Sequence, residues 1–297
     1  MPGLVPYALR HISVTPCIRN AVDDPYPGAM WEGDAWVAVE AGRAGAEVVR
    51  RGFLEDFATE LKGSVDPVTV IDREAEEAIK EVIAAHLPGD EILAEEGGGA
   101  DWRGHRVWIV DPLDGTVNFV NRLPQVAVSI ALWSEARPLV GVVIDVTREE
   151  EFVAVLGEGA RANGAPIHVS ETALLQDSLL ATGFPYDRQE HARAYLDVME
   201  QVMTRSRGTR RMGAAALDMA WVACGRFDGY WEHGGPHGVK PWDAAAGTLL
   251  VTEAGGTATD SRGSSFDLEP SAFVVSNGKI HEELRQIVDD WMPGHLR

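Results

Sequence analysis

Apolar residues recur at spacings of three and four positions from Asp34 onward, with polar residues between them. The apolar positions are Val37, Ala41, Ala44 and Val48, followed by Phe53 and Phe57. Residues spaced in this way share one helical face, so the pattern predicts a long amphipathic helix. A second amphipathic helix is expected from about Arg73 to His86, because Pro88-Gly89 follows its last apolar turn.

Short apolar or alternating runs follow the second helix and predict β-strands. The expected strands cover residues 91–94, 106–110, 126–133, 138–146 and 151–155. The connections between them are short and hairpin-like, so we expect an antiparallel sheet in this part of the chain.

The second half of the chain alternates between strand-like and helix-like segments. Strands are expected at residues 179–182, 227–232 and 272–276, and helices at 190–203, 214–224, 241–253 and from 279 onward. Helices and sheets that alternate in this manner predict a layered α+β or α/β sandwich. Residues 1–33 are expected to form an irregular arm, because five prolines interrupt any periodic pattern. We therefore divide residues 34–297 into two halves, 34–182 and 183–297.

Forty-six acidic and 26 basic residues give the 297-residue chain a formal net charge of −20. The average field repels nucleic-acid phosphates and anionic membrane surfaces, so we expect neither as a partner. A small phosphorylated molecule would enter only a cleft in which bound divalent cations reverse the potential.

Cysteine usage and hydropathy give expectations about compartment. Cys17 and Cys224 provide neither a disulfide framework nor a closely spaced zinc-ligand pair. No signal-peptide core is evident, and the apolar run 126–133 is too short to cross a bilayer. We expect a soluble cytoplasmic protein.

Several carboxylates lie beside glycine or proline, at expected turns or element ends, where a side chain can face a cleft. They are Asp72, Glu95, Glu96, Asp111, Asp114 and Asp243. Magnesium prefers hard oxygen ligands in octahedral geometry, and clustered carboxylates supply them. Taken singly, however, each of these acids is more typical of a helix cap, a helix start or a solvated turn than of a metal site.

The segment from Asp111 to Thr116 concentrates the relevant groups. We expect a strand to end at Asp111, after which Pro112 fixes the backbone and Gly115 lets it turn, so that both aspartates point to one place. The carbonyl of Leu113 is a further oxygen ligand in this interpretation. The amides of Gly115 and Thr116 are candidate donors to a phosphate oxygen.

The order of these motifs carries a resemblance. The motifs run from Asp66 to Asp72, Ala94 to Glu96, Trp108 to Phe119, Lys240 to Gly247 and Glu253 to Gly256. Together they resemble the inositol monophosphatase family over roughly residues 34–292. The resemblance implies alternating αβαβα layers, with a metal-binding half at 34–182 and Asp243 and the substrate residues in 183–297.

The resemblance also implies roles for the residues. Glu95, Asp111 and the Leu113 carbonyl would hold one Mg²⁺, and Asp111, Asp114 and Asp243 a second, with a weaker third ion also on Glu95. Asp72 and Thr116 would activate the attacking water, and Glu95 counts with them as catalytic. Lys62-Gly63 resembles a mobile loop near the site. Lithium sensitivity and a homodimer are expected on the same ground.

Substrate contacts follow from the same resemblance. They would come from Asp114, Gly115, Thr116, Gly213, Ala214, Ala215, Glu232 and Asp243. The 213–215 segment would offer free amides at a helix start, although close packing is an equal explanation. A glycine-rich insertion from His233 to Val239 departs from the family spacing and puts inositol specificity in doubt. His233 and His237 in this insertion are expected to be mainly solvent-exposed.

Two classes of function remain open at this point. The first is a Mg²⁺-dependent phosphomonoesterase for a small polyol phosphate such as inositol 1-phosphate, attacked directly by water. Histidinol phosphate, fructose 1,6-bisphosphate and a nucleotide 3′-phosphate are the alternative substrates, and an aspartyl-phosphate route remains open. The second class is a non-catalytic metal-binding regulatory protein.

Overall fold

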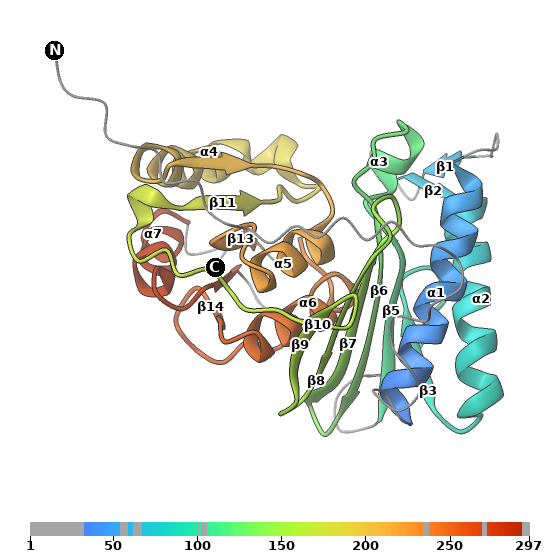
Figure 1. Ribbon diagram of the computed structural model, residues 1–297. Coiled ribbons are helices and arrows are strands. Elements are labelled where there is room, and N and C mark those ends of the chain that lie inside the picture. Colours follow the sequence, from blue (N-terminus) through green and yellow to red (C-terminus); the bar gives the residue numbers. More distant parts are fainter. Residues whose placement is uncertain are drawn as a thin grey trace, which may run out of the picture.

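Two long helices form one outer layer of the protein, as seen in the computed structural model (Figure 1). The structure describes residues 33–53, 59–61, 67–99, 101, 106–233, 238–268 and 272–292. The helices are α1 (Asp34–Gly52) and α2 (Val70–His86). Thr69 caps α2, because its hydroxyl accepts from backbone amides while the Asp72 carboxylate accepts from the Thr69 amide. The expected N-terminal arm and Lys62-Gly63 lie outside the described residues.

An eight-stranded sheet packs against α1 and α2 through a shared apolar core. Its order is β10-β9-β8-β7-β6-β5-β3-β4. The bounds are β3 (Glu91–Ala94), β4 (Gly98–Gly99), β5 (Val107–Asp114), β6 (Ala127–Ser134), β7 (Arg137–Asp145), β8 (Glu150–Val155), β9 (Gly159–Ala162) and β10 (Ala165–Pro166). The sheet is antiparallel except where β3 pairs in parallel with β5, so the expectation of a purely antiparallel sheet was wrong at this edge.

The middle layer consists of α5 (Ala215–Ala223) and α6 (Pro241–Glu253). Gly141 of β7 lets α6 approach the sheet closely, since a Cβ atom there would lie 2.9 Å from the Ala246 carbonyl oxygen. Gly247 gives a similar close approach between α6 and Met219 of α5. The apolar core around these helices contains residues of both halves of the chain.

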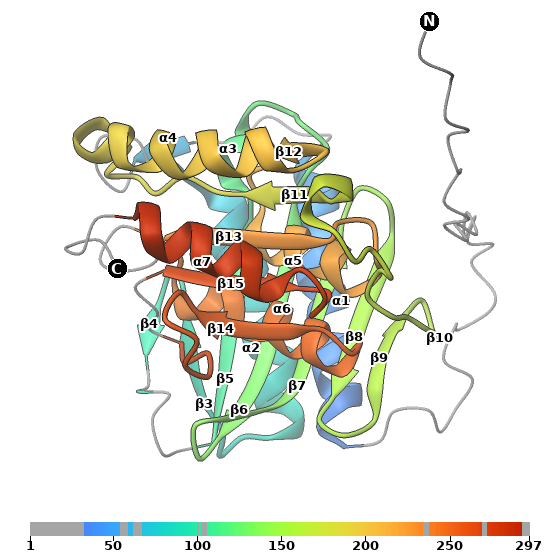
Figure 2. The ribbon, with the colours of Figure 1, turned by 90° about the vertical axis from the view of Figure 1, so that its left-hand side faces the viewer.

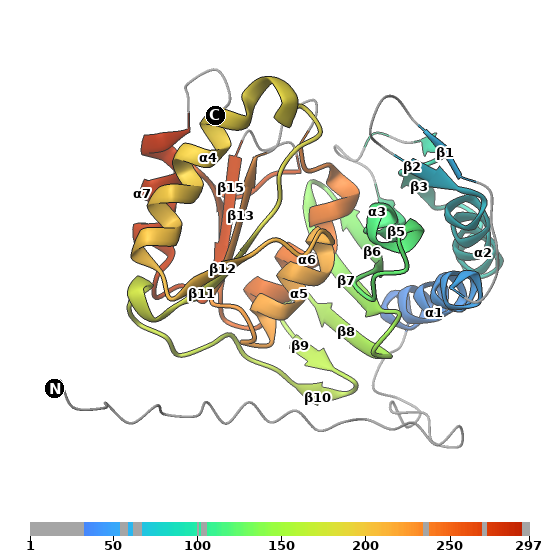
Figure 3. The same cartoon turned by 90° about the horizontal axis from the view of Figure 1, so that it is seen from above.

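A second sheet lies on the other side of α5 and α6, with order β12-β11-β13-β15-β14. The strands are β11 (Leu179–Thr182), β12 (Gly208–Arg210), β13 (Gly229–His233), β14 (Thr257–Asp260) and β15 (Ala272–Ser276). Helices α4 (Arg188–Arg205) and α7 (His281–Trp291) cover its outer face (Figure 2). The view from above shows the resulting αβαβα layers, which confirms the expected layered sandwich (Figure 3).

Smaller elements complete the fold, and sequence periodicity did not predict them. They are the pair β1 (Thr59–Leu61) and β2 (Pro67–Thr69), the short helix α3 (Thr116–Val120) and the 3₁₀ turn Leu175–Asp177. Most of the longer elements lie within about two residues of their predicted bounds. Within the described ranges, no helix is both long and apolar enough to cross a membrane.

Candidate active site

Asp111 and Asp114 both lie in β5, which continues through the segment expected to be a loop. The register against β6 shifts between Asp111, opposite Ser129, and Asp114, opposite Ala127. This irregularity accommodates Pro112 in the strand and redirects the side chains that follow. Gly115 then adopts a left-handed conformation with φ 92°, and a Cβ there would lie 2.8 Å from the Gln125 carbonyl oxygen.

Asp243 reaches the same place from the first turn of α6. The Ser129 hydroxyl donates to the Trp242 carbonyl at 3.1 Å, so β6 holds the residue before Asp243 next to β5. The Asp243 carboxylate accepts from the Lys240 amide at 2.7 Å, which fixes its orientation at the helix start. Two segments more than a hundred residues apart in sequence thus meet at one point.

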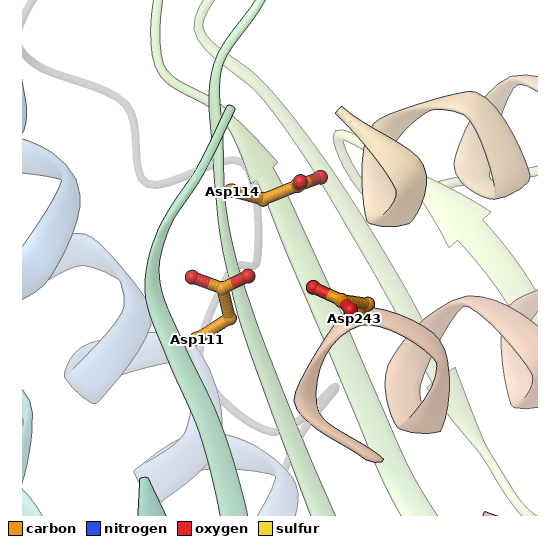
Figure 4. Close-up of side chains that lie close together, drawn as sticks. All are labelled: Asp111, Asp114 and Asp243. Atoms are coloured by element: carbon orange, nitrogen blue, oxygen red, sulfur yellow. The ribbon is translucent and has the colours of Figure 1, made fainter. Parts of the chain in front are cut away.

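The three carboxylates converge, as the close-up shows (Figure 4). One oxygen from each of Asp111, Asp114 and Asp243 lies within 4.8 Å of the others. Burial, followed by repulsion from Glu95 and from its two partners in the cluster, raises the pKa of Asp111 well above its ordinary value. Burial also raises the pKa of Asp114 and of Asp243 to about 7. Burial and mutual repulsion disfavour three ionised carboxylates at one place, and a hard divalent cation bound by their oxygens would offset both effects.

The Asp114 carboxylate has a second contact, with the N-terminus of α5. It accepts from the amides of Ala215 at 3.1 Å, Ala216 at 2.8 Å and Leu217 at 3.4 Å. The expectation that the Ala215 amide is free for a substrate was therefore wrong, because this amide donates to Asp114. The helix end holds an anion as expected, but the anion is a side chain of the protein itself.

Asp72 and Thr116 meet at the start of two helices. The Thr116 hydroxyl lies 3.2 Å from Asp72 Oδ1 and 3.1 Å from the Leu113 carbonyl oxygen. The other carboxylate oxygen of Asp72 accepts from the amide of Thr69 at 2.7 Å and from its hydroxyl at 2.5 Å. Burial raises the pKa of Asp72, while the hydrogen bonds from Thr69 oppose that shift.

A cleft of about 830 Å³ opens over these groups. Its walls contain every site residue expected from the sequence except Asp72, which lies behind Thr116. These are Glu95, Asp111, Leu113, Asp114, Gly115, Thr116, Gly213, Ala214, Ala215, Glu232 and Asp243. Glu95 lines the cleft and raises the pKa of Asp111 and Asp114, but it is not one of the three tightly grouped carboxylates.

Glu232 also lines the cleft, near enough to Asp243 for the two carboxylate charges to repel each other. The Tyr230 hydroxyl donates to its carboxylate, and burial raises the pKa of Glu232 to about 7. Gly183 of the neighbouring segment leaves room for it, since a Cβ at Gly183 would overlap the Glu232 carboxylate oxygens. The Tyr230 hydroxyl therefore orients the Glu232 carboxylate, and glycine at position 183 leaves the space that the carboxylate fills.

Sequence reasoning missed several polar residues of the cleft. Arg211, Asp218, Tyr230 and Lys240 all line it. Their signal in the sequence was weak, because Asp218 lies within an apolar helix and Arg211 within an arginine-rich turn. Only the folded chain brings Asp218 near Asp114 and Glu232, and Arg211 near Glu232.

His233 is the last residue of β13 and is only 5% exposed. Its ring packs 5.9 Å from the ring of Tyr195, so the expectation of a solvent-exposed side chain was wrong. The strand continues one residue further than predicted and carries His233 into the core. Residues 234–237 of the insertion, including His237, lie outside the described part of the chain.

Comparison with known proteins decides the family. The family model described as the inositol monophosphatase family matches residues 31–292. The chain belongs to the inositol monophosphatase family. Among curated family members, the Nus factor SuhB of Pseudomonas aeruginosa is 39% identical over 272 residues, covering 88% of this chain and 97% of that protein. The inositol-1-monophosphatase of Synechocystis is 43% identical over 244 residues, covering 82% and 84%.

Solved structures of the family have the same fold. Extragenic suppressor protein SuhB from Bartonella henselae matches with a TM-score of 0.80 and 36% identity, covering 85% of this chain and 96% of that one. The inositol monophosphatase from Anabaena matches with a TM-score of 0.78 and 36% identity, covering 89% and 98%.

Proposed function

We propose that the chain is a Mg²⁺-dependent phosphomonoesterase that hydrolyses a small polyol phosphate such as inositol 1-phosphate. The observation that supports this most is the convergence of Asp111, Asp114 and Asp243 beside the Asp72–Thr116 pair in one cleft. Membership of the family and the name of the Synechocystis relative support the same substrate class.

Asp111, Asp114 and Asp243 would hold the magnesium, with Glu95 and the Leu113 carbonyl completing the ligand set for two or three ions. Bound Mg²⁺ supplies charge neutralisation at the phosphoryl group and a lower pKa for water. A chain with a net charge of −20 needs this compensation before an anionic ester can enter the cleft.

The Asp72–Thr116 pair would manage the proton of the attacking water. The Thr116 hydroxyl donates to Asp72 or to the Leu113 carbonyl, which leaves its oxygen able to accept a proton. Water gives a proton to Thr116 Oγ1 as Thr116 gives its own to Asp72. The resulting hydroxide oxygen forms a bond to phosphorus while the bond from phosphorus to the alcohol oxygen breaks, and the departing alkoxide takes a proton from a water molecule in the open cleft. The raised pKa of Asp72 makes it a stronger base than an exposed aspartate.

Substrate hydroxyls would contact Glu232, whose carboxylate faces the cleft beside Tyr230. The Ala214 and Gly213 segment forms the adjoining wall. Millimolar lithium is expected to inhibit the reaction, as the family resemblance implies, and unchanged turnover in lithium would contradict that expectation.

The test is phosphate release from a panel of esters after the protein is stripped of metal and resupplied with Mg²⁺. The panel contains inositol 1-phosphate, histidinol phosphate, fructose 1,6-bisphosphate, adenosine 3′-phosphate and p-nitrophenyl phosphate. We expect the highest catalytic efficiency with inositol 1-phosphate. A large preference for histidinol phosphate, the bisphosphate or the nucleotide would replace the substrate, and no release from any ester would overturn the proposal.

Asp111→Asn is the matched active-site variant, and we expect it to fold but to lose turnover. Asp228→Asn is the control, because Asp228 is also a buried aspartate but lies just before β13, outside the residues that line the cleft. Its carboxylate accepts from the Ser170 hydroxyl and the Leu179 amide. Full activity in the Asp111 variant would refute the metal-ligand assignment.

A regulatory role without catalysis is the second candidate, and the name Nus factor carried by the SuhB relatives is the observation that favours it. The intact Asp72–Thr116 pair favours catalysis instead, since a chain without turnover has no need of it. The ester panel separates the two. We also predict a homodimer, and gel filtration with light scattering would test this.

A further inference from the structure

Asp218 is a buried acid that the proposed mechanism does not use. It lies in the first turn of α5, one residue beyond the three amides that hold Asp114. Its side chain is 1% exposed, yet it lines the wall of the active-site cleft. It therefore lies at the boundary between the protein core and the space for the substrate.

One buried oxygen of the Asp218 carboxyl group, Oδ1, has no hydrogen-bond partner among the described residues. A buried oxygen without a donor costs roughly 1–3 kcal/mol, so such groups in folded proteins call for an explanation. Asp114 and Glu232 differ in this respect, because α5 amides donate to the first and Tyr230 to the second.

The surroundings of Asp218 define what the missing partner is. Burial, followed by repulsion from the carboxylates of Asp114 and Glu232, raises the pKa of Asp218 well above its ordinary value, and attraction to Arg211 opposes that shift. Two further acids nearby disfavour a second phosphate or a carboxylate at this point. A neutral group with hydrogens to donate is the chemistry that fits.

We propose that Asp218 is a specificity-determining residue that, together with Glu232, accepts hydrogen bonds from two hydroxyls of the leaving alcohol. This inference rests on the proposed phosphatase function and adds to it a second acceptor. It assigns the wall between α5 and β13 to a hydroxyl-rich alcohol and excludes the second phosphate of a bisphosphate from that wall.

A purely structural role would have a different signature. An acid in the first turn of a helix interacts favourably with the helix dipole, so Asp218 would then contribute to the stability of α5 alone. Loss of such a contribution lowers the free energy of unfolding but does not discriminate between alcohols. The distinguishing quantity is therefore a ratio of two substrates measured on one folded enzyme.

The experiment compares inositol 1-phosphate, whose leaving group carries five hydroxyls, with p-nitrophenyl phosphate, whose leaving group carries none. Asp218→Leu replaces both acceptor oxygens with methyl groups and keeps the branching of the side chain. We expect it to lower the ratio of the two kcat/KM values about 10-fold or more, the effect of losing one well-made hydrogen bond to a substrate. Most of the change should appear in the KM for inositol 1-phosphate.

Asp218→Asn keeps the shape and one acceptor, so we expect a ratio between those of wild type and the leucine variant. It carries the comparison if the leucine variant does not fold. Asp228→Asn serves as the control for loss of a buried aspartate outside the cleft. The increase in Tm on adding Mg²⁺, measured on each variant, verifies that the metal site is intact.

Equal losses on both esters, or no change on either, would overturn the assignment of Asp218. If the wild-type protein releases phosphate from neither ester, the proposed function itself fails, and this inference fails with it. The two failures are thus distinguished by the wild-type measurement alone.

Discussion

The Ser129 hydroxyl donates to the Trp242 carbonyl oxygen at 3.1 Å. Asp111 pairs with Ser129 in the sheet, and Asp243 follows Trp242 in the chain. One side-chain hydrogen bond therefore links α6, which supplies Asp243, to β6, the neighbour of the strand that supplies the other two carboxylates. The arrangement of Asp111, Asp114 and Asp243 therefore depends on contacts made by other residues.

Ser129→Ala is expected to weaken Mg²⁺ binding about 5-fold, because a typical hydrogen bond contributes about 1 kcal/mol to a preorganised site. The measurement is a titration of Mg²⁺ followed by calorimetry or by the rise in Tm. Ser134→Ala, at the other end of β6, is the control and should bind Mg²⁺ like the wild type. Unchanged affinity in the Ser129 variant would show that α6 is positioned by packing alone.

Thr116→Val replaces the hydroxyl that lies between Asp72 and Leu113 with a methyl group of nearly equal size. We expect kcat to fall by roughly 10²-fold or more, since proton transfer by a positioned group contributes about that factor. Thr116→Ser retains the hydroxyl and should recover most of the activity. A valine variant with kcat within a few-fold of wild type would remove Thr116 from the proton path.

The metal-free protein should lose stability as the pH rises. Burial raises the pKa of Asp114 and of Asp243 to about 7, whereas an unfolded aspartate has a pKa of about 3.9. Between these values the folded state binds more protons than the unfolded state, so the free energy of unfolding decreases with increasing pH across that window. At pH 8 all of this contribution is lost.

Magnesium binds the deprotonated carboxylates, so its stabilising effect should increase over the same range. We expect a larger rise in Tm on adding Mg²⁺ at pH 8 than at pH 6, measured against the protein in EDTA. In Asp243→Asn the dependence of this increment on pH should shrink. An increment of equal size at both pH values would argue against the raised pKa values.

Gly141→Ala tests the close approach between the large sheet and the middle layer. The added Cβ would lie 2.9 Å from the carbonyl oxygen and 3.1 Å from the Cα of Ala246. Backbone atoms cannot rotate away, so we expect a loss of roughly 1–3 kcal/mol in the free energy of unfolding, measured by denaturant titration. Gly89→Ala has no atom within 4 Å of the new methyl group and should differ little from wild type.

The layered fold and the grouping of the carboxylates could be predicted from the sequence, because periodicity and motif order carry both. The course of β5 could not. Asp111-Pro112 and Asp114-Gly115 are dipeptides typical of turns, yet the strand stays buried through Asp114 because its irregular pairing with β6 absorbs the proline. The local sequence of β5 does not indicate this irregular pairing, because the pairing depends on β6.

Long-range hydrogen bonds were also beyond sequence reasoning. The Ala215 amide looked available to a ligand because helix starts leave amides unpaired, and only the folded chain shows that Asp114 occupies it. His233 looked like part of a glycine-rich loop, but it is buried against Tyr195 of α4, which precedes it by 38 residues in the chain.

The hydrogen bonds from the first amides of α5 to the Asp114 carboxylate have a consequence for the order of synthesis. The carboxylate emerges from the ribosome a hundred residues before the amides of Ala215, Ala216 and Leu217 that fix it, and Asp243 follows later still. The magnesium site proposed above therefore cannot assemble before Asp243 has been translated, because this residue would be one of its ligands. Metal binding at this site would then follow synthesis of the large sheet and of α5, both of which precede Asp243 in the chain.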